Sequence, residues 1–376
     1  MLLSPFSIRH VEMPNRVVVS PMAQYSALDG LPGPHHSVHY GSLAKGGAGM
    51  VMVESTGVSA HGRITNGCLG MYTDEQRDAF KPIVNYMHEC GTMAAIQLGH
   101  GGRKASMQRP WEGNGPMTEA NVANGDKRWQ PVGASALPLD DGWPTPTQMD
   151  QATLRQTADD FAKAARRSLD AGFDIIEVHM AHGYLLQSFL SPLSNKRTDA
   201  YGGSRENMMR FPLEVVAAVR EEIGTEVPLF ARISCIDAID GGWEIHDSVA
   251  FAHALKTQGV DVVDCSSGGN SPKGATNSNL KRGPGFQVPF AETIRRETGI
   301  MTQAVGLIRN IAQAQEILDK GQADLIAIGR DFLYNPLWLL HQVHQANQDP
   351  DFENWPTPYA WWLEKWDKGI KSTRNT

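Results

Sequence analysis

The chain has 376 residues, with 34 basic against 41 acidic side chains and a formal net charge of −7. This balance, with no run of five like charges, argues against nucleic acid or an anionic membrane surface as the main partner. No segment approaches the roughly 20 apolar residues of a membrane-spanning helix, and the N-terminal sequence lacks the pattern of a secretory signal. We therefore expect a cytoplasmic protein whose four widely spaced cysteines are free thiols.

Eight short apolar runs recur along the chain, and we expect each of them to be a strand. Their apolar residues are consecutive, as in residues 50–53. A continuous run indicates a strand that is buried on both faces, which is typical of a parallel sheet. The predicted strands are residues 16–20, 49–54, 93–98, 174–179, 228–234, 260–266, 301–306 and 324–329.

Amphipathic stretches typical of helices lie between these runs. Several of them end at a glycine, a residue that often follows the last turn of a helix. The predicted helices are residues 74–90, 153–171, 207–224, 248–258 and 311–320. Strands that alternate with helices predict an α/β fold, here a (β/α)8 TIM barrel that forms one domain over residues 1–376.

Two segments depart from the barrel pattern. Residues 101–149, after the third strand, are rich in Gly, Pro, Asn and Trp and show no clear period. A loop of this length is expected to be a lid or a binding surface. Residues 355–366 near the C-terminus are densely aromatic. Such a tail either covers its own barrel or reaches a neighbouring subunit, and the sequence leaves both possibilities open.

The fourth predicted strand is followed by His179, His182 and Tyr184. Active sites of these barrels lie at the carboxyl ends of the strands. Two imidazoles can donate hydrogen bonds to one developing oxyanion, and a phenol on the other side of the reacting bond can deliver a proton. The same His-x-x-His spacing also suits a metal ion, and each histidine alone could be an ordinary core residue.

The other strand ends carry groups suited to a phosphorylated cofactor. Arg232 lies in an apolar strand and needs a carboxylate or an anionic ligand, while Gly306, Gly329 and Arg330 follow the two strands that commonly bind phosphate. Carboxylates are nearly absent from the strand ends, which disfavours a metal-dependent hydrolase. A flavin fits better, because a fixed arginine stabilises negative charge near N1 and C2=O and Gln97 can pair with the pyrimidine edge.

Short motifs spread in order over nearly the whole chain carry a family resemblance. They include Ser20-Pro21-Met22 and the His179–Tyr184 segment. The full set is residues 15–16, 20–22, 25, 62–65, 96–98, 102–105, 109–113, 179–184, 189–193, 195–203 and 329–330. In these motifs the chain resembles the old yellow enzyme family of FMN-dependent ene-reductases, and within it the bacterial branch that includes the xenobiotic reductases.

The resemblance implies a cofactor site, a catalytic set and a reaction. Non-covalent FMN would be held by Pro21, Met22, Ala23, Ser55, Gln97, His179, Arg232, Gly306, Gly329 and Arg330. The catalytic residues would be His179, His182 and Tyr184, and the substrate would also contact Tyr25 and Trp362. NAD(P)H would reduce FMN. Hydride from flavin N5 and a proton from Tyr184 would then reduce the activated C=C bond of an α,β-unsaturated carbonyl compound.

Two positions depart from the family pattern. Ala23 stands where relatives in this branch commonly have Cys beside the flavin, and Val305 stands where close relatives can carry an aromatic residue. The same site could instead serve nitro-ester reduction, a catabolic ring reduction or desaturation. An alternative of another class is a non-catalytic barrel that binds a phosphorylated ligand. We expect a homodimer or homotetramer with no bound metal and no nucleic-acid or membrane partner.

Overall fold

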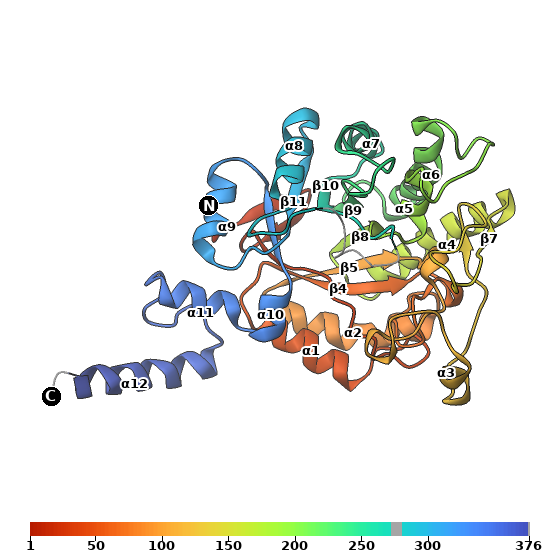
Figure 1. Ribbon diagram of the computed structural model, residues 1–376. Helices are drawn as coiled ribbons and strands as arrows, with labels where there is room; N and C mark the ends of the chain where they lie inside the picture. The colour runs from red at the N-terminus through yellow and green to blue at the C-terminus, as the bar shows by residue number, and fades with distance from the viewer. Residues whose placement is uncertain (272–279, 375–376) are drawn as a thin grey trace.

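Eight parallel strands close into a barrel in the computed structural model, which describes residues 1–271 and 280–374 (Figure 1). The strands follow one another around the barrel in chain order, and pairing of Ile326 with Val17 closes the ring. They are β3 (Val17–Val19), β4 (Met50–Gly57), β5 (Met93–Gly99), β8 (Ile175–Met180), β9 (Leu229–Ser234), β10 (Val262–Ser266), β11 (Met301–Ala304) and β12 (Leu325–Ile328). The predicted TIM barrel is confirmed.

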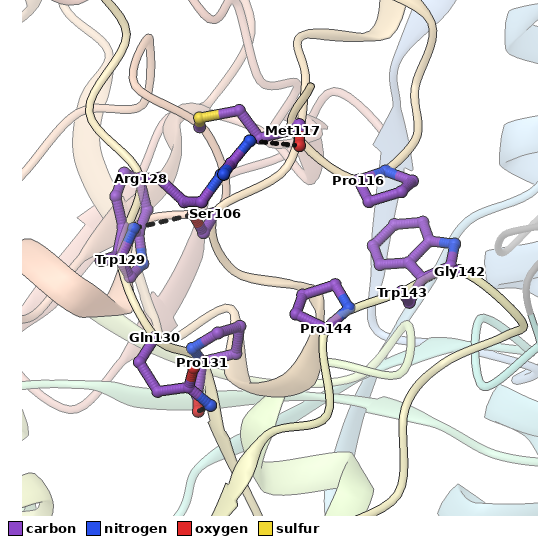
Figure 2. Close-up of a pocket in the computed structure, with 10 residues that line it drawn as sticks. All are labelled: Ser106, Pro116, Met117, Arg128, Trp129, Gln130, Pro131, Gly142, Trp143 and Pro144. Carbon is purple, nitrogen blue, oxygen red and sulfur yellow. Dashed lines mark hydrogen bonds between the residues drawn. The ribbon is translucent and has the colours of Figure 1, made fainter. Parts of the chain in front are cut away.

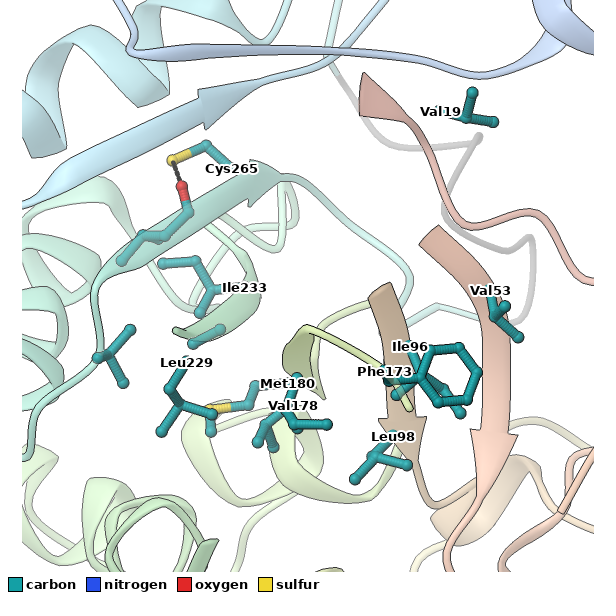
Figure 3. Close-up of a cluster of buried hydrophobic side chains, with 14 of the residues drawn as sticks. Val19, Val53, Ile96, Leu98, Phe173, Val178, Met180, Leu229, Ile233 and Cys265 are labelled. Atoms are coloured by element: carbon teal, nitrogen blue, oxygen red, sulfur yellow. Dashed lines mark hydrogen bonds between the residues drawn. The ribbon is translucent and has the colours of Figure 1, made fainter. Parts of the chain in front are cut away.

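Helices surround the barrel because each strand is apolar on its outward face. Side chains such as Ile96, Val178 and Ile233 form one buried core with the inner faces of the helices (Figure 3). The surrounding helices are α1 (Pro34–Ala44), α2 (Asp74–Glu89), α4 (Gln151–Asp170), α6 (Arg205–Ile223), α7 (Ile245–Thr257), α8 (Val288–Thr298) and α9 (Ile311–Asp319). Shorter helices are α3 (Glu119–Ala123), α5 (Leu185–Leu190), α10 (Arg330–Tyr334) and α11 (Trp338–Gln345).

A small hairpin, which the sequence did not predict, closes the amino-terminal end of the barrel. It consists of β1 (Phe6–Ile8) and β2 (Val11–Met13), paired antiparallel. Ile8, Val11 and Met13 are buried against inward-facing strand residues such as Met50 and Phe230. The amino-terminal end is thus filled with apolar side chains, and functional groups are left to the opposite end.

Predicted and observed strands differ at their ends, and two of the differences bear on the site. β4 continues past Glu54 to Gly57, after a shift of register between Val53 and Thr56. β11 stops at Ala304, because the chain turns at Gly306, whose φ of +119° suits glycine. Both differences lie at the carboxyl end of the barrel, where loops begin.

The segment 101–149 is folded rather than irregular. It contains two 3-10 turns, η2 (Gly102–Lys104) and η3 (Pro110–Glu112), the helix α3, and a short two-stranded sheet of β6 (Val132–Gly133) and β7 (Thr147–Gln148). The Arg109–Asp126 ion pair, at 3.2 Å, joins distant parts of the segment.

The aromatic tail forms a helix, α12 (Thr357–Arg374), that extends away from the barrel (Figure 1). Trp355, before the helix, is buried against α11, but Trp361, Trp362 and Trp366 are 51, 66 and 60% exposed. The tail therefore does not cover its own barrel. No helix within the described residues has the length and apolar character that crossing a membrane requires.

Candidate active site

The structure brings His179, His182 and Tyr184 together where β8 ends. The ring centroids of His179 and His182 are 5.1 Å apart, and those of His179 and Tyr184 are 5.2 Å apart. The predicted catalytic trio is thus one compact cluster at the carboxyl end of the barrel.

The backbone between these residues makes a tight left-handed turn. His182 has φ +62° and Gly183 has φ +74°. A Cβ on Gly183 would lie 2.2 Å from the carbonyl oxygen of Gly269, so this position requires glycine. The turn reverses the chain within the few residues between His179 and Tyr184, and both rings face the same space.

Hydrogen bonds from residues of β9, β10 and η2 hold His182. Ser234 Oγ accepts from the His182 amide at 3.0 Å, and a 2.7 Å hydrogen bond joins His182 Nε2 to Ser266 Oγ. Lys104 Nζ donates to the His182 carbonyl at 2.8 Å and to the carbonyl of Gly269. The imidazole is therefore held before any substrate arrives, which is the preorganisation that an oxyanion site needs.

The two histidines are neutral at neutral pH. Burial, followed by the positive charge of Arg232, lowers the pKa of His179 and of His182 well below the usual range of histidine. Each neutral ring keeps one N–H to donate. Burial raises the pKa of Tyr184, so its phenol keeps its proton at neutral pH.

Tyr25 reaches the same space from the loop after β3. Its φ of +50° is unusual for a tyrosine, and the loop is fixed by Glu54, whose Oε2 accepts from the Gln24 amide at 2.7 Å. Burial, followed by interaction with Tyr184, raises the pKa of Tyr25. The exposed Trp111 packs edge-on against Tyr25, with ring centroids 5.9 Å apart. The role of Tyr25 as a pocket wall stays a prediction.

A cavity of about 520 Å³ lies beside the trio and gathers most of the predicted cofactor residues. The predicted residues that line it are Pro21, Met22, Arg232, Gly306, Gly329 and Arg330. A Cβ on Gly306 would lie 3.0 Å from Phe286, and a Cβ on Gly329 would lie 3.3 Å from Met22 Sδ. Side chains at either glycine would crowd the cavity wall. The donor set, with two arginines, fits a ligand that carries a phosphate and an anionic ring edge.

Arg232 lines this cavity and also neighbours the trio, whereas Gln97 and Ser55 lie near the trio without lining the cavity. Gln97 Nε2 donates to Glu177 Oε1 at 2.7 Å, and Arg232 is the register neighbour of His179. Ser55 and His179 both approach Gly99, where a Cβ would lie 2.7 Å from Ser55 Oγ and 3.5 Å from His179 Cβ. Ser55, Gln97 and His179 thus lie near one another at the carboxyl end of the barrel, and their contact with a flavin stays a prediction.

Two predicted site residues lie elsewhere. Ala23 is half-buried between Met22 and Gln24 and does not line the cavity. Trp362 lies on α12, 66% exposed and away from the barrel (Figure 1). Within a single chain, Trp362 does not reach the site.

The sequence analysis missed several residues around the site. Ser266, Ser267, Arg282 and Gln287 line the cavity, and Lys104 contacts the histidine turn. Glu177 and Asp264 are buried carboxyl groups inside the barrel, close to Arg232. Arg232 Nε lies 3.3 Å from Asp264 Oδ2, so the carboxylate required for the buried arginine comes from β10. The sequence prediction concerned the strand ends and did not consider the layer beneath them, where these two carboxyl groups lie.

A second cavity, of about 510 Å³, is formed within the 101–149 segment (Figure 2). Trp129 and Trp143 lie on opposite sides of it, with Met117 and three prolines between them. The Trp129 amide donates to Ser106 Oγ at 3.0 Å. The segment thus has a hollow of its own, as expected for a binding surface. Among the residues that the structure describes, no group of three or more His, Cys, Asp or Glu side chains could hold a metal ion.

The chain is similar to known proteins over most of its length. Residues 1–349 match the sequence pattern of the NADH:flavin oxidoreductase / NADH oxidase family. The chain is 44% identical over 340 residues to a NADPH dehydrogenase from Geobacillus sp. (strain WCH70), covering 90% of this chain and 92% of the relative.

Two solved structures share the fold. Morphinone reductase is similar with a TM-score of 0.74 and 28% identity, covering 92% of this chain and 89% of that one. An old yellow enzyme homologue from Zymomonas mobilis is similar with a TM-score of 0.74 and 27% identity, covering 89% and 90%.

Proposed function

Because the chain belongs to the NADH:flavin oxidoreductase / NADH oxidase family, the family of the old yellow enzyme homologues, and is therefore an oxidoreductase, we propose that it uses FMN and NAD(P)H to reduce activated C=C bonds. The substrate would be an α,β-unsaturated carbonyl compound. The alternative of a non-catalytic phosphate-binding barrel is set aside, because it does not agree with this family.

The 520 Å³ cavity supports FMN as the cofactor. Gly306, Gly329 and Arg330 would hold the phosphate, and Gln97 with Arg232 would hold the polar edge of the ring. When bound, FMN supplies the hydride chemistry, since it accepts hydride from a nicotinamide and passes it to a substrate carbon. The protein supplies position and charge.

The histidine pair would bind the carbonyl oxygen of the substrate. Both rings are neutral at neutral pH, and each has an N–H that can donate a hydrogen bond to oxygen. Donation from two sides withdraws electrons from the conjugated system and makes Cβ electrophilic. The donation strengthens as negative charge develops on the oxygen, and this difference is what accelerates a reaction.

Tyr184 would protonate Cα of the substrate. Its phenol is protonated at neutral pH and lies next to His179. The single observation that carries the proposal is the clustering of this phenol with two neutral imidazoles beside the cofactor cavity.

The direct test is an anaerobic titration of the purified protein. We expect a yellow preparation that is bleached by NADPH or NADH and re-oxidised by cyclohexenone-type enones, with the saturated ketone as product. The relatives named NADPH dehydrogenase favour NADPH as the better reductant. A preparation that stays colourless after FMN is added would contradict the proposal. A bleached protein that no enone re-oxidises would limit it to the first half-reaction.

We further propose that the chain belongs to the branch of the family that includes the xenobiotic reductases. We also propose that its active unit is a homodimer or homotetramer. The exposed Trp361, Trp362 and Trp366 of α12 support a neighbouring subunit as the tail's contact. Trp362 would then complete the substrate site of a partner. Light scattering combined with truncation after residue 356 tests this arrangement, since truncation should lower the oligomeric state.

A further inference from the structure

Two carboxyl groups lie inside the barrel, one layer below the catalytic residues. Glu177 comes two residues before His179 on β8, and Asp264 comes two residues before Ser266 on β10. Alternate residues of a strand face the same side, so both carboxyl groups point inward with these site residues. Both residues are 0% exposed. Neither of them has a part in the proposed reaction.

These carboxyl groups have few partners. Glu177 Oε1 accepts from Gln97 at 2.7 Å and Asp264 interacts with the side chain of Gln303, whereas Glu177 Oε2 receives no hydrogen bond within the described residues. The register neighbour of Asp264 on β11 is Gln303, an uncharged amide. Arg232, between them on β9, is the cation of the cluster, with Nε 3.3 Å from Asp264 Oδ2. Two buried acids thus share one guanidinium.

Such a cluster favours one retained proton. Two buried carboxylates beside a single cation leave one uncompensated charge, which is costly away from water. Burial, followed by the negative charge of Asp264, raises the pKa of Glu177 to about 8, with Arg232 acting in the opposite direction. Burial also raises the pKa of Asp264. Because Asp264 is the acid whose oxygen lies 3.3 Å from Arg232 Nε, we assign the retained proton at neutral pH to Glu177.

The other groups that face this cluster titrate in different ranges. The imidazoles of His179 and His182, above it, stay neutral. Burial, followed by the charge of Arg103, lowers the pKa of Lys104 to about 7, so Lys104 titrates below the range of Glu177. Gln97 on β5 and Gln303 on β11 do not titrate. Above about pH 8, Glu177 is the group that changes charge.

We propose that Glu177 is an internal proton site coupled to the charge of the bound flavin, an inference that rests on the proposed FMN cofactor. Reduction adds negative charge beside Arg232, on the side away from Asp264. The guanidinium then compensates the acid pair less, and the pair binds a proton more tightly. The hydride brings its own two electrons and proton, and the additional proton comes from solvent and forms the O–H bond of Glu177.

The test is the pH dependence of the flavin midpoint potential, measured by spectroelectrochemistry from about pH 7 to about pH 9.5. Each proton taken up by a two-electron couple contributes about 30 mV per pH unit. We expect the wild-type slope above about pH 8 to be larger by this amount than the slope of Glu177→Gln. The glutamine keeps an acceptor for Gln97 but does not titrate.

Glu54→Gln is a matched control. Glu54 is also a buried strand carboxyl, and burial raises its pKa to about 7, but it faces Tyr40 and the Gln24 amide instead of Arg232. This variant should keep the steeper wild-type slope above about pH 8.

Three outcomes would overturn the inference. They are a wild-type slope that does not steepen above pH 8, a Glu177→Gln slope as steep as that of wild type, and a loss of the steep slope in Glu54→Gln. If Glu177→Gln does not fold, the wild-type slope alone still decides, because a line without a steeper segment contradicts the proposal. A protein that binds no flavin overturns this inference and the proposed function together, whereas a flavoprotein with a uniform slope overturns the inference alone.

Discussion

The histidine corner, residues 179–184, and the helix α12 hold their aromatic side chains in opposite ways. In the corner, His182 is hydrogen-bonded to Ser234 of β9, Ser266 of β10 and Lys104 of η2. On α12, Trp361 contacts Trp362 and Lys365 of the same helix, and its ring remains 51% exposed. The family match ends at residue 349, before α12 begins.

This difference shows which side chains are held in place by contacts within a single chain. The corner is positioned by the barrel, so its geometry is complete in one chain. The exposed tryptophans of α12 have a large apolar surface that a single chain leaves in water, and their order depends on what they meet. Substitutions in the two regions should therefore affect different measurements.

The largest effect is expected at Tyr184. Replacing it by Phe removes the proposed proton donor while keeping the ring, so enone reduction should slow by about 100- to 10,000-fold. Flavin reduction by NAD(P)H should keep its rate, because no substrate carbon is protonated in that step. Stopped-flow measurements of the two half-reactions under nitrogen make the comparison. Equal slowing of both would mean that Tyr184 is a structural residue of the corner.

His182→Ala should come next. Loss of one donor to a developing oxyanion costs about 100- to 1,000-fold in rate. Binding of phenol-type ligands should weaken in parallel, which flavin difference spectra report. His182→Asn, which retains a donor, is the matched variant and should recover part of both losses. If alanine and asparagine behaved alike, hydrogen-bond donation by His182 would not be what matters.

Gly183→Ala should break the corner through its backbone. The residue has φ +74°, and the new Cβ would lie 2.2 Å from the Gly269 carbonyl oxygen, so a loss of stability of about 2–3 kcal/mol is expected. Gly203→Ala is the control, because Gly203 has φ +85° but a Cβ there would meet nothing within 4 Å. Its cost should be near 1 kcal/mol. Urea unfolding of both variants separates steric contact from backbone strain, and equal losses would show that the contact is relieved.

The smallest effect on stability is expected at the tail. Trp362→Ala should change the unfolding free energy by less than about 0.5 kcal/mol and leave the flavin content unchanged, because the side chain is 66% exposed. Its effect should appear in oligomeric state and in the KM for enones. Trp355→Ala, which removes a ring packed against Phe352 and His341, should instead cost about 3 kcal/mol. A wild-type KM in Trp362→Ala would remove Trp362 from the substrate site.

The sequence predicted the barrel well because its strands are buried on both faces. Runs such as residues 50–53 have no polar alternation, and a strand of this kind is typical of a parallel sheet that is covered on both faces. The hairpin of β1 and β2 was missed because three-residue strands carry almost no periodic signal. Helix α1 was missed because its sequence, with His35, His36 and His39, has a weak apolar stripe.

The sequence predicted those site residues whose type suggests a chemical role. It missed residues that come close to the site only through the folding of the chain. His179, His182 and Tyr184 follow a strand in a recognisable order. Glu177 and Asp264 have apolar neighbours in sequence, and their closeness to Arg232 arises from the register of strands distant along the chain. Trp362 shows the converse, since a family resemblance assigned it to the site, and the single chain leaves it outside.

The β1–β2 hairpin leaves one end of the barrel as the entrance for both reactants of the proposed reaction. With Ile8, Val11 and Met13 filling one end of the barrel, the described residues leave the carboxyl end as the route to the cofactor cavity. If nicotinamide and enone also bind at the same place on the flavin, as proposed, they take turns there. Steady-state kinetics should be ping-pong. At high concentration each reactant should inhibit, because it also binds the redox state of the protein with which it cannot react and so blocks the other reactant.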